Sequence, residues 1–94
     1  MHIRDVEIYS DQTNAAVMRH PDRRFPGVLV QGDSLYSLCV RADDACALAR
    51  DLLDSDSYDE LNELRNALWS YLNYYKSVLG EHQIPMPFSE AAGA

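Results

Sequence analysis

The sequence predicts an α+β fold in which a three-stranded antiparallel β-meander packs on an antiparallel two-helix hairpin, in the order βββαα, with an extended C-terminal tail. Short apolar runs separated by turn residues fill the first third of the chain, a helical spacing of apolar residues begins at Leu35, and prolines interrupt the chain after Gly80. The 94 residues leave room for one domain. We expect a single domain, residues 1–94, divided into a meander at 1–32, helices at 33–54 and 57–79, and a tail at 80–94.

Three segments before position 32 have the composition of β-strands. Ile3 to Tyr9 alternates loosely between apolar and charged residues, and the turn residues 11–14 separate it from a second segment, Ala15 to Arg19. The third segment, Val28 to Val30, is an uninterrupted apolar run between two glycines, as is typical of a covered strand. Since the connections are short, we expect the strands to pair as an antiparallel meander.

The first helix is predicted to start at Gly32-Asp33-Ser34, a bend followed by two side chains that can accept hydrogen bonds from the free N–H groups of a helix N-terminus. We interpret Ser34 as a cap of this helix. The apolar residues that follow share an arc of about 120° at 100° per residue, which defines a stripe for a second helix. The stripe consists of Leu35, Leu38, Ala42, Ala45, Cys46, Ala49, Leu52 and Leu53.

The second helix is predicted to open with the capping box Ser57-x-x-Glu60 and to close at Gly80, with Pro85 beyond it. Additional apolar residues widen its stripe, and we expect this extra arc to lie on the sheet. The stripe consists of Leu61, Leu64, Leu68, Leu72, Tyr75 and Leu79, and the extra arc of Ala67, Tyr71, Tyr74 and Val78, with Trp69 on the other side. In the tail, Ile84 and Phe88 flank Met86 at alternate positions, which predicts an ordered, extended edge segment.

Two segments carry a resemblance to a known family. They read R-F-P-G-V-L-V-Q-G-D-S-L at residues 24–35 and H-x-I-P-x-P-F at residues 82–88. With these segments the chain resembles a family of small acidic bacterial proteins of unknown function. The resemblance implies a compact, stand-alone bacterial domain, and it implies no activity, catalytic residue or ligand.

The charge of the chain narrows the class of partner. The formal net charge is −7, and acids and bases balance over residues 1–32, so the whole excess belongs to residues 33–94. This balance disfavours nucleic acid as a partner and favours a basic protein.

Cys39 and Cys46, seven residues apart on one helix, would have Cα atoms about 10 Å apart, too far for a disulfide, so we expect buried reduced thiols. With neither a leader nor a long apolar run, we expect no membrane segment and a cytoplasmic location.

Gly32-Asp33-Ser34-Leu35 spells the nucleophile motif of the GDSL-type serine esterases and lipases. That family activates its serine with an Asp and a His from a D-x-x-H segment near the C-terminus, whereas here Leu79 stands three residues before His82. The chain is also too short for the parallel sheet of that family. We therefore predict no catalytic residue and treat the esterase as the least favoured function. The scattered histidines and the lack of a phosphate-cradling glycine loop predict no metal and no cofactor.

Two helix surfaces are candidates for binding, although either can be an ordinary solvated face. One side of the first helix combines apolar side chains with carboxylates, which suits a basic protein partner anchored by the tyrosine. Its residues are Tyr36, Val40, Asp43, Asp44, Ala47 and Asp51. The outer side of the second helix carries asparagines and serines beside a tryptophan, which favours self-association. Its key residues are Asn62, Asn66, Trp69 and Asn73.

These observations predict a small cytoplasmic protein-binding domain without catalytic activity, an immunity-like or antitoxin-like inhibitor of a basic partner such as a toxin. The alternative is a self-associating accessory or regulatory domain, for example a homodimer. The two functions depend on different helix faces, so substitutions on each face discriminate between them.

Overall fold

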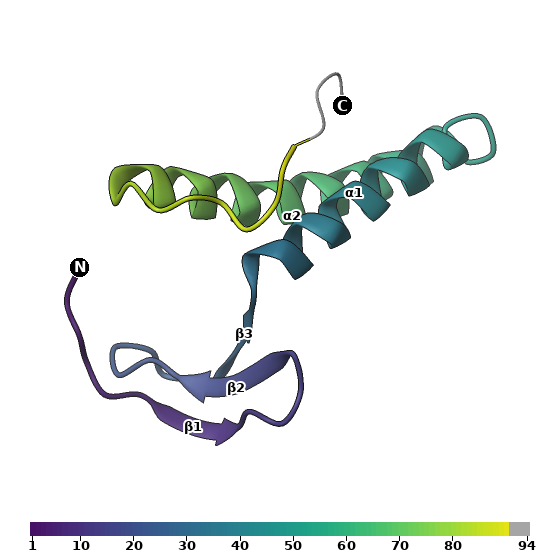
Figure 1. The fold of residues 1–94 in the computed structure, drawn as a ribbon. Helices are drawn as coiled ribbons and strands as arrows, with labels where there is room; N and C mark the ends of the chain where they lie inside the picture. The colour runs from purple at the N-terminus through teal and green to yellow at the C-terminus, as the bar shows by residue number, and fades with distance from the viewer. Residues whose placement is uncertain (91–94) are drawn as a thin grey trace. The chain divides into compact units, whose positions relative to one another are not determined.

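The structure, a computed structural model, describes residues 1–90 and contains three strands followed by two helices (Figure 1). The strands are β1 (Glu7–Ser10), β2 (Ala15–Arg19) and β3 (Gly27–Val30), and the helices are α1 (Gly32–Ala49) and α2 (Ser55–Glu81). The predicted α+β order βββαα is confirmed. The last four residues of the predicted tail, 91–94, lie outside the described residues. The chain forms two compact units that divide after Gln31.

The first unit is an antiparallel sheet with strand order β1-β2-β3. Glu7 pairs with Arg19 and Ile8 with Met18, after which the register shifts at a bulge, and β3 pairs along β2 from Gly27 to Val30. The first strand begins at Glu7, four residues later than the predicted start at Ile3. In the turn between β1 and β2, the Thr13 hydroxyl donates to the carbonyl oxygen of Ala15 at 2.9 Å and orders the start of β2.

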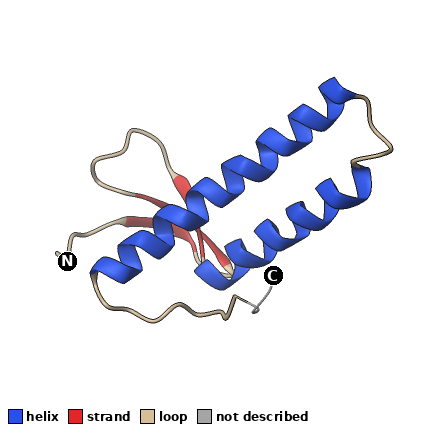
Figure 2. Cartoon of the chain, turned by 90° about the horizontal axis from the view of Figure 1, so that it is seen from above, coloured by secondary structure: helices blue, strands red, loops and turns tan. Residues whose placement is uncertain are grey.

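The second unit is an antiparallel helical hairpin in which α1 and α2 lie side by side (Figure 2). Its buried apolar side chains are Cys39, Cys46 and Leu72, so the predicted packing of both cysteines in the helix seam is confirmed, and both are free thiols. Burial, with a smaller contribution from the Asp43 carboxylate, raises the pKa of Cys39. At one end of the seam Gly32 is buried, and a Cβ atom there would overlap the ring of Tyr75.

The first helix differs from its prediction at both ends. It begins at Gly32, so Ser34 lies inside the first turn and is not the N-cap. The Ser34 amide donates to the Asp33 carboxylate at 2.9 Å. The helix ends at Ala49, whose carbonyl accepts from the amides of Leu52 at 2.9 Å and Leu53 at 3.1 Å. Residues 50–54 therefore form the turn between the helices, and the predicted continuation to 54 is wrong.

The second helix begins at Ser55 and is capped by Asp54, so the predicted cap at Ser57 is wrong. The Asp54 carboxylate accepts from the Ser57 amide at 2.7 Å, which lowers the pKa of Asp54. Ser57 thus donates to the cap from the third position of the helix. An aspartate is as good an N-cap as a serine, and its negative charge also interacts favourably with the helix dipole.

The C-terminus of α2 also lies beyond the predicted residue. Gly80 is helical, and the left-handed position is occupied by Gln83 with φ 57°. The Ile84 amide donates to the Leu79 carbonyl at 2.9 Å and the Gln83 amide to the Gly80 carbonyl at 3.2 Å, which is the hydrogen-bond pattern of a Schellman motif. This turn directs the tail back along the helical hairpin (Figure 2).

Candidate protein-interaction surfaces

A polar cluster joins α1 to α2 on one side of the seam, and it combines residues from both predicted surfaces. The indole Nε1 of Trp69 donates to the Asp43 carboxylate at 2.9 Å, and Arg65 Nη1 lies 3.4 Å from the same oxygen. Arg65 Nη2 donates to the Asn62 side-chain oxygen at 2.8 Å. We call these four residues the Asp43 cluster. Asp43, Asn62 and Trp69 are thus half-buried and bonded within the chain, and their roles in partner binding and self-association stay predictions.

The tail covers the aromatic residue that was predicted to anchor a partner. The rings of Tyr36 and Phe88 are stacked, with centroids 4.3 Å apart and planes inclined by 3°. Lys76 on α2 forms an ion pair with Glu90 farther along the tail. Tyr36 is therefore half-buried where it stacks on Phe88, and its role as the anchor of a partner stays a prediction. Of the three apolar tail residues, Phe88 is half-buried whereas Ile84 and Met86 stay exposed.

The other predicted surface residues keep their solvent exposure, with one exception. Asp44 and Ala47 are exposed on α1, Asp51 is exposed in the turn after it, and Val40 is half-buried. On α2, Asn66 and Asn73 are exposed. What remains of the predicted partner surface is thus acidic and lies toward the turn between the helices.

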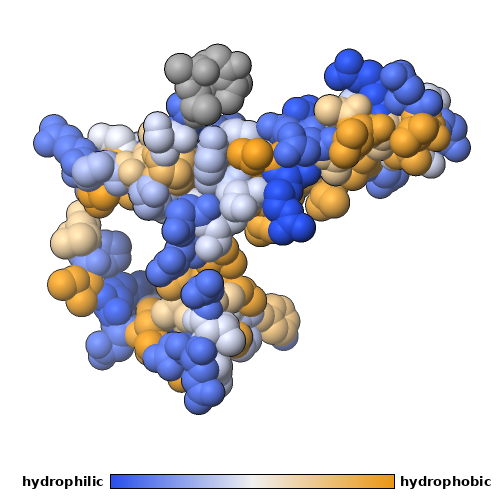
Figure 3. Space-filling model, turned by 45° about the vertical axis from the view of Figure 1, so that its right-hand side comes forward, coloured by the Kyte–Doolittle hydropathy of each residue, from blue (hydrophilic) through white to orange (hydrophobic). Residues whose placement is uncertain are grey.

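That turn carries a set of exposed leucines that the sequence analysis did not assign to a surface. Leu48 is 76% exposed, Leu52 82% and Leu53 41%. Figure 3 shows orange hydrophobic surface beside blue hydrophilic surface at the end of the helical hairpin where α1 joins α2. We call this region the hairpin tip. It comprises Leu48, Leu52, Leu53, Asp51, Asp54, Asp56, Asp59 and Glu60.

The hairpin tip is strongly acidic. Residues 50–60 contain five acidic residues and one basic residue, Arg50, so their formal charge is −4. Asp54 uses its carboxylate as the N-cap of α2, while Asp51 and Asp56 accept no hydrogen bond among the contacts found in residues 1–90. A small apolar group among carboxylates is the arrangement from which a basic partner was predicted, and Leu48 and Leu52 lie 12 and 16 residues farther along the chain than Tyr36.

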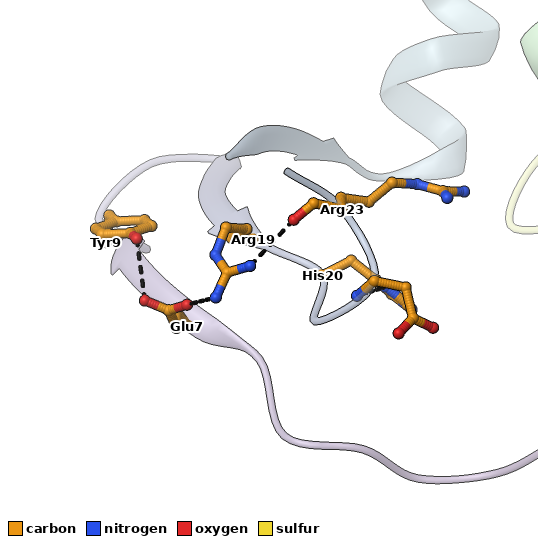
Figure 4. Close-up of polar contacts among 6 residues, drawn as sticks. Glu7, Tyr9, Arg19, His20 and Arg23 are labelled. Atoms are coloured by element: carbon orange, nitrogen blue, oxygen red, sulfur yellow. Dashed lines mark hydrogen bonds and ion pairs between the residues drawn. The ribbon is translucent and has the colours of Figure 1, made fainter. Parts of the chain in front are cut away.

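In the sheet, the charged residues form contacts within the unit (Figure 4). Arg19 on β2 pairs with Glu7 on β1 and donates to the Arg23 carbonyl at 3.0 Å, and the Tyr9 hydroxyl donates to Glu7 at 3.1 Å. The bond from Arg19, followed by that from Tyr9, lowers the pKa of Glu7. His20 Nδ1 accepts from the Asp22 amide at 3.1 Å in the loop after β2. These bonds hold β1 and the loop after β2 against β2. The charged side chains of Glu7 and Arg19 therefore have a structural role within the sheet.

The serine of the esterase motif and the possible metal ligands can be placed within the part of the chain that the structure describes. Ser34 is half-buried in the first turn of α1, and its neighbour Asp33 accepts from its amide. Within residues 1–90, His, Cys, Asp and Glu do not gather into a group of three or more that could hold a metal ion. Neither α1 nor α2 has the length and apolar character needed to cross a membrane.

Comparison with known proteins assigns a family. Neither the curated proteins nor the solved structures include a match to this chain. A family model does match, and it covers residues 1–88, which is nearly the whole chain. The resemblance to a family of unknown function is thereby confirmed, and the chain belongs to the family of unknown function DUF6959.

Proposed function

We propose that this protein is a small, non-catalytic protein-binding domain that recognises a basic partner protein through the hairpin tip. In the form that best fits its composition, it acts in the bacterial cytoplasm as an immunity-like or antitoxin-like inhibitor. The partner would place a basic surface over the carboxylates of the tip and apolar side chains over its leucines. The proposal keeps the chemistry predicted from the sequence and moves the anchor from Tyr36 to the tip.

The observation that carries this proposal is the exposure of the tip leucines within a ring of acids. Leu52 is 82% exposed in a five-residue turn, where a polar residue would serve the turn equally well. Covering a leucine of this kind is worth about 1.5–3 kcal/mol, so two such anchors make a substantial contribution to affinity. The proposal therefore assigns affinity to Leu48 and Leu52.

The carboxylates around these leucines would act mainly on the rate of association. They lie within eleven consecutive residues, 50–60, so a basic partner would meet their summed field. Rim charges of this kind raise the association rate and suppress acidic competitors. Asp51 and Asp56 are the informative positions, because Asp54 is also needed as a helix cap.

The experiment is capture of partners from a host lysate on immobilised protein, followed by binding kinetics with each purified candidate. A true partner is basic, loses at least about tenfold in affinity with Leu52→Ser, and associates more slowly with Asp51→Asn combined with Asp56→Asn. The matched control is Ser70→Ala, on the exposed surface of α2 away from the tip, which should bind like the wild type. An acidic partner, or a basic partner whose binding neither Leu52→Ser nor the combined Asp51→Asn and Asp56→Asn variant changes, would overturn the proposal.

A further inference from the structure

One side of α2 carries an apolar stripe that is largely exposed to solvent. Leu64, Ala67, Tyr71, Tyr74 and Val78 are spaced by three or four residues, which places them on one side of the helix. Tyr71 is 70% exposed, Tyr74 73% and Leu64 58%. Most of this stripe is the extra apolar arc of the second helix that was predicted to lie on the sheet. A long helix that exposes two tyrosines and a leucine in line has the pattern of an interaction surface.

Helical geometry places this stripe opposite the Asp43 cluster. Leu72 is buried and marks the side of α2 that faces α1. Measured as rotation about the axis of α2, the stripe lies about 80–160° from Leu72 in one direction, and Trp69 lies about 60° from it in the other direction. On α1, Leu38 lies about 100° from the buried Cys39 in the same sense as the stripe, and it is 43% exposed. Because the two helices are antiparallel, residues that are rotated from the seam in the same direction on each helix lie on the same side of the pair. Leu38 and the stripe together form what we call the apolar face.

The charge distribution distinguishes this face from the hairpin tip. The stripe residues and Leu38 are all uncharged, whereas the excess acids concentrate at the tip and on the exposed side of α1 that carries Asp44. A basic partner would gain nothing electrostatically on this face. Two copies of the chain, each with net charge −7, can meet there while their densest acidic regions stay apart.

We propose that the apolar face joins two copies of this chain in a twofold-symmetric dimer, with α2 of one protomer packed on α2 of its partner. Such an isologous contact pairs the same surface of each subunit and makes a four-helix arrangement from two hairpins. Tyr71 and Tyr74 lie at its centre. The self-association surface predicted from Asn62, Asn66, Trp69 and Asn73 is thus replaced by the opposite side of the helical hairpin.

The available area predicts a weak dimer. A tyrosine buries about 150–250 Å² when fully covered, so Tyr71 and Tyr74 offer about 280 Å² together at their exposures of 70% and 73%. Leu38 and Leu64 add about 100 Å². Two copies would bury about 800 Å² from these side chains, and more with Ala67 and Val78, which approaches the lower limit of specific interfaces. We expect a dissociation constant between about 1 µM and 1 mM.

Sedimentation velocity from about 1 µM to about 1 mM tests the proposal directly, because this range spans the expected dissociation constant. The wild type should pass from monomer to dimer, and Tyr71→Glu should weaken the dimer at least about tenfold. Asn66→Lys, the matched control on the other side of α2, should leave it unchanged. Circular dichroism verifies that both variants remain folded. A wild type that stays monomeric throughout, or a dimer that Asn66→Lys disrupts and Tyr71→Glu does not, would overturn the proposal.

A second measurement does not depend on destabilising the interface. Ala67→Cys and Val78→Cys each place a thiol on the apolar face, at equal distances on either side of the centre at Tyr71 and Tyr74, while the native cysteines are buried. In a twofold contact that keeps the acidic tips apart the two α2 helices run antiparallel, so position 67 of one protomer faces position 78 of its partner. Under mild oxidation a mixture of these two variants should form a disulfide-linked dimer much faster than either of them mixed with Ser70→Cys. Equal or reversed rates would contradict this arrangement. Leu52→Ser should not alter either experiment, so a failure here is distinguishable from a failure of the tip as a partner site.

Discussion

Gly32 is the position where one added methyl group should damage the helical hairpin most. It is the buried first residue of α1, and a Cβ there would overlap the Tyr75 ring on α2. Gly32→Ala must therefore move this ring or separate the helices, and overpacking of this kind costs about 1–3 kcal/mol. Alanine has the better helix propensity by at most about 1 kcal/mol. The expected net loss is about 1–2 kcal/mol, because Tyr75 is half-buried and can yield partly.

Thermal and urea unfolding measure this loss. For a domain of this size, each 1 kcal/mol lowers the Tm by roughly 4–8 °C. Gly80→Ala is the matched control: Gly80 is also helical, but nothing lies within 4 Å of its would-be Cβ, so the propensity gain should raise the Tm. Tyr75→Ala should remove the penalty of Gly32→Ala in the double variant. A Gly32→Ala protein as stable as the wild type would refute the tight packing of the Tyr75 ring against this residue.

Three further predictions concern the ends of α2 and the tail. Gln83→Gly should raise the free energy of unfolding by about 0.5–1 kcal/mol in urea titrations, because glycine accepts the φ of 57° without strain; a loss would contradict the Schellman assignment. Asp54→Ala should lower the Tm at pH 7. Since the pKa of Asp54 is lowered on folding, its contribution is complete above the unfolded value of about 3.9 and is lost as pH falls through the folded value, so the Tm difference should shrink in acid. A difference that stays constant from neutral to strongly acidic pH would refute this. Phe88→Ala should cost about 1 kcal/mol through the lost stacking on Tyr36, whereas Phe25→Ala, at an exposed ring, should cost less; equal costs would show that the stack is not stabilising.

Apolar periodicity was sufficient to predict the helical hairpin because its seam repeats a simple pattern. Cys46 and Leu72 belong to the predicted stripes and are buried, and Cys39 beside the first stripe is buried too, whereas Leu38 and Leu64 are exposed. The three strands likewise follow from short apolar segments separated by turn residues. Both signals are local and need no knowledge of neighbouring elements.

The turn between the helices could not be predicted in the same way. Leu52 and Leu53 continue the angular stripe of α1, so periodicity alone extends the helix through them. The chain leaves the helix at Ala49, and Asp54 accepts the Ser57 amide as the next helix starts. Asp54 and Ser57, three residues apart, are both acceptable N-caps for this helix, and the local sequence does not show which of them is used. The exposed leucines of the tip were missed for this reason.

Assignment of outward faces failed where long side chains reach across the seam. Trp69 and Asp43 each lie only about 40–60° from the centre of their buried stripes, within reach of the opposite helix. The Trp69 indole then donates to Asp43 at 2.9 Å, a bond that depends on how α1 and α2 are aligned lengthwise. Tyr36 is covered by Phe88, more than fifty residues away in sequence. Neither contact can be read from the period of a single helix.

The two proposed surfaces predict opposite responses to salt. Binding at the hairpin tip draws on a formal charge of −4 over residues 50–60, so raising the ionic strength should slow association with a basic partner as the Debye length falls from about 10 Å at 0.1 M to about 3 Å at 1 M. The apolar face carries no charge of its own, and screening the net charge of −7 removes repulsion between copies, so the dimer should be unchanged or stronger, especially in sulfate. Sedimentation and binding kinetics on one preparation at low and high salt measure both effects. A dimer that dissociates as salt rises would show that charged contacts hold it, and the apolar face would then not be its interface.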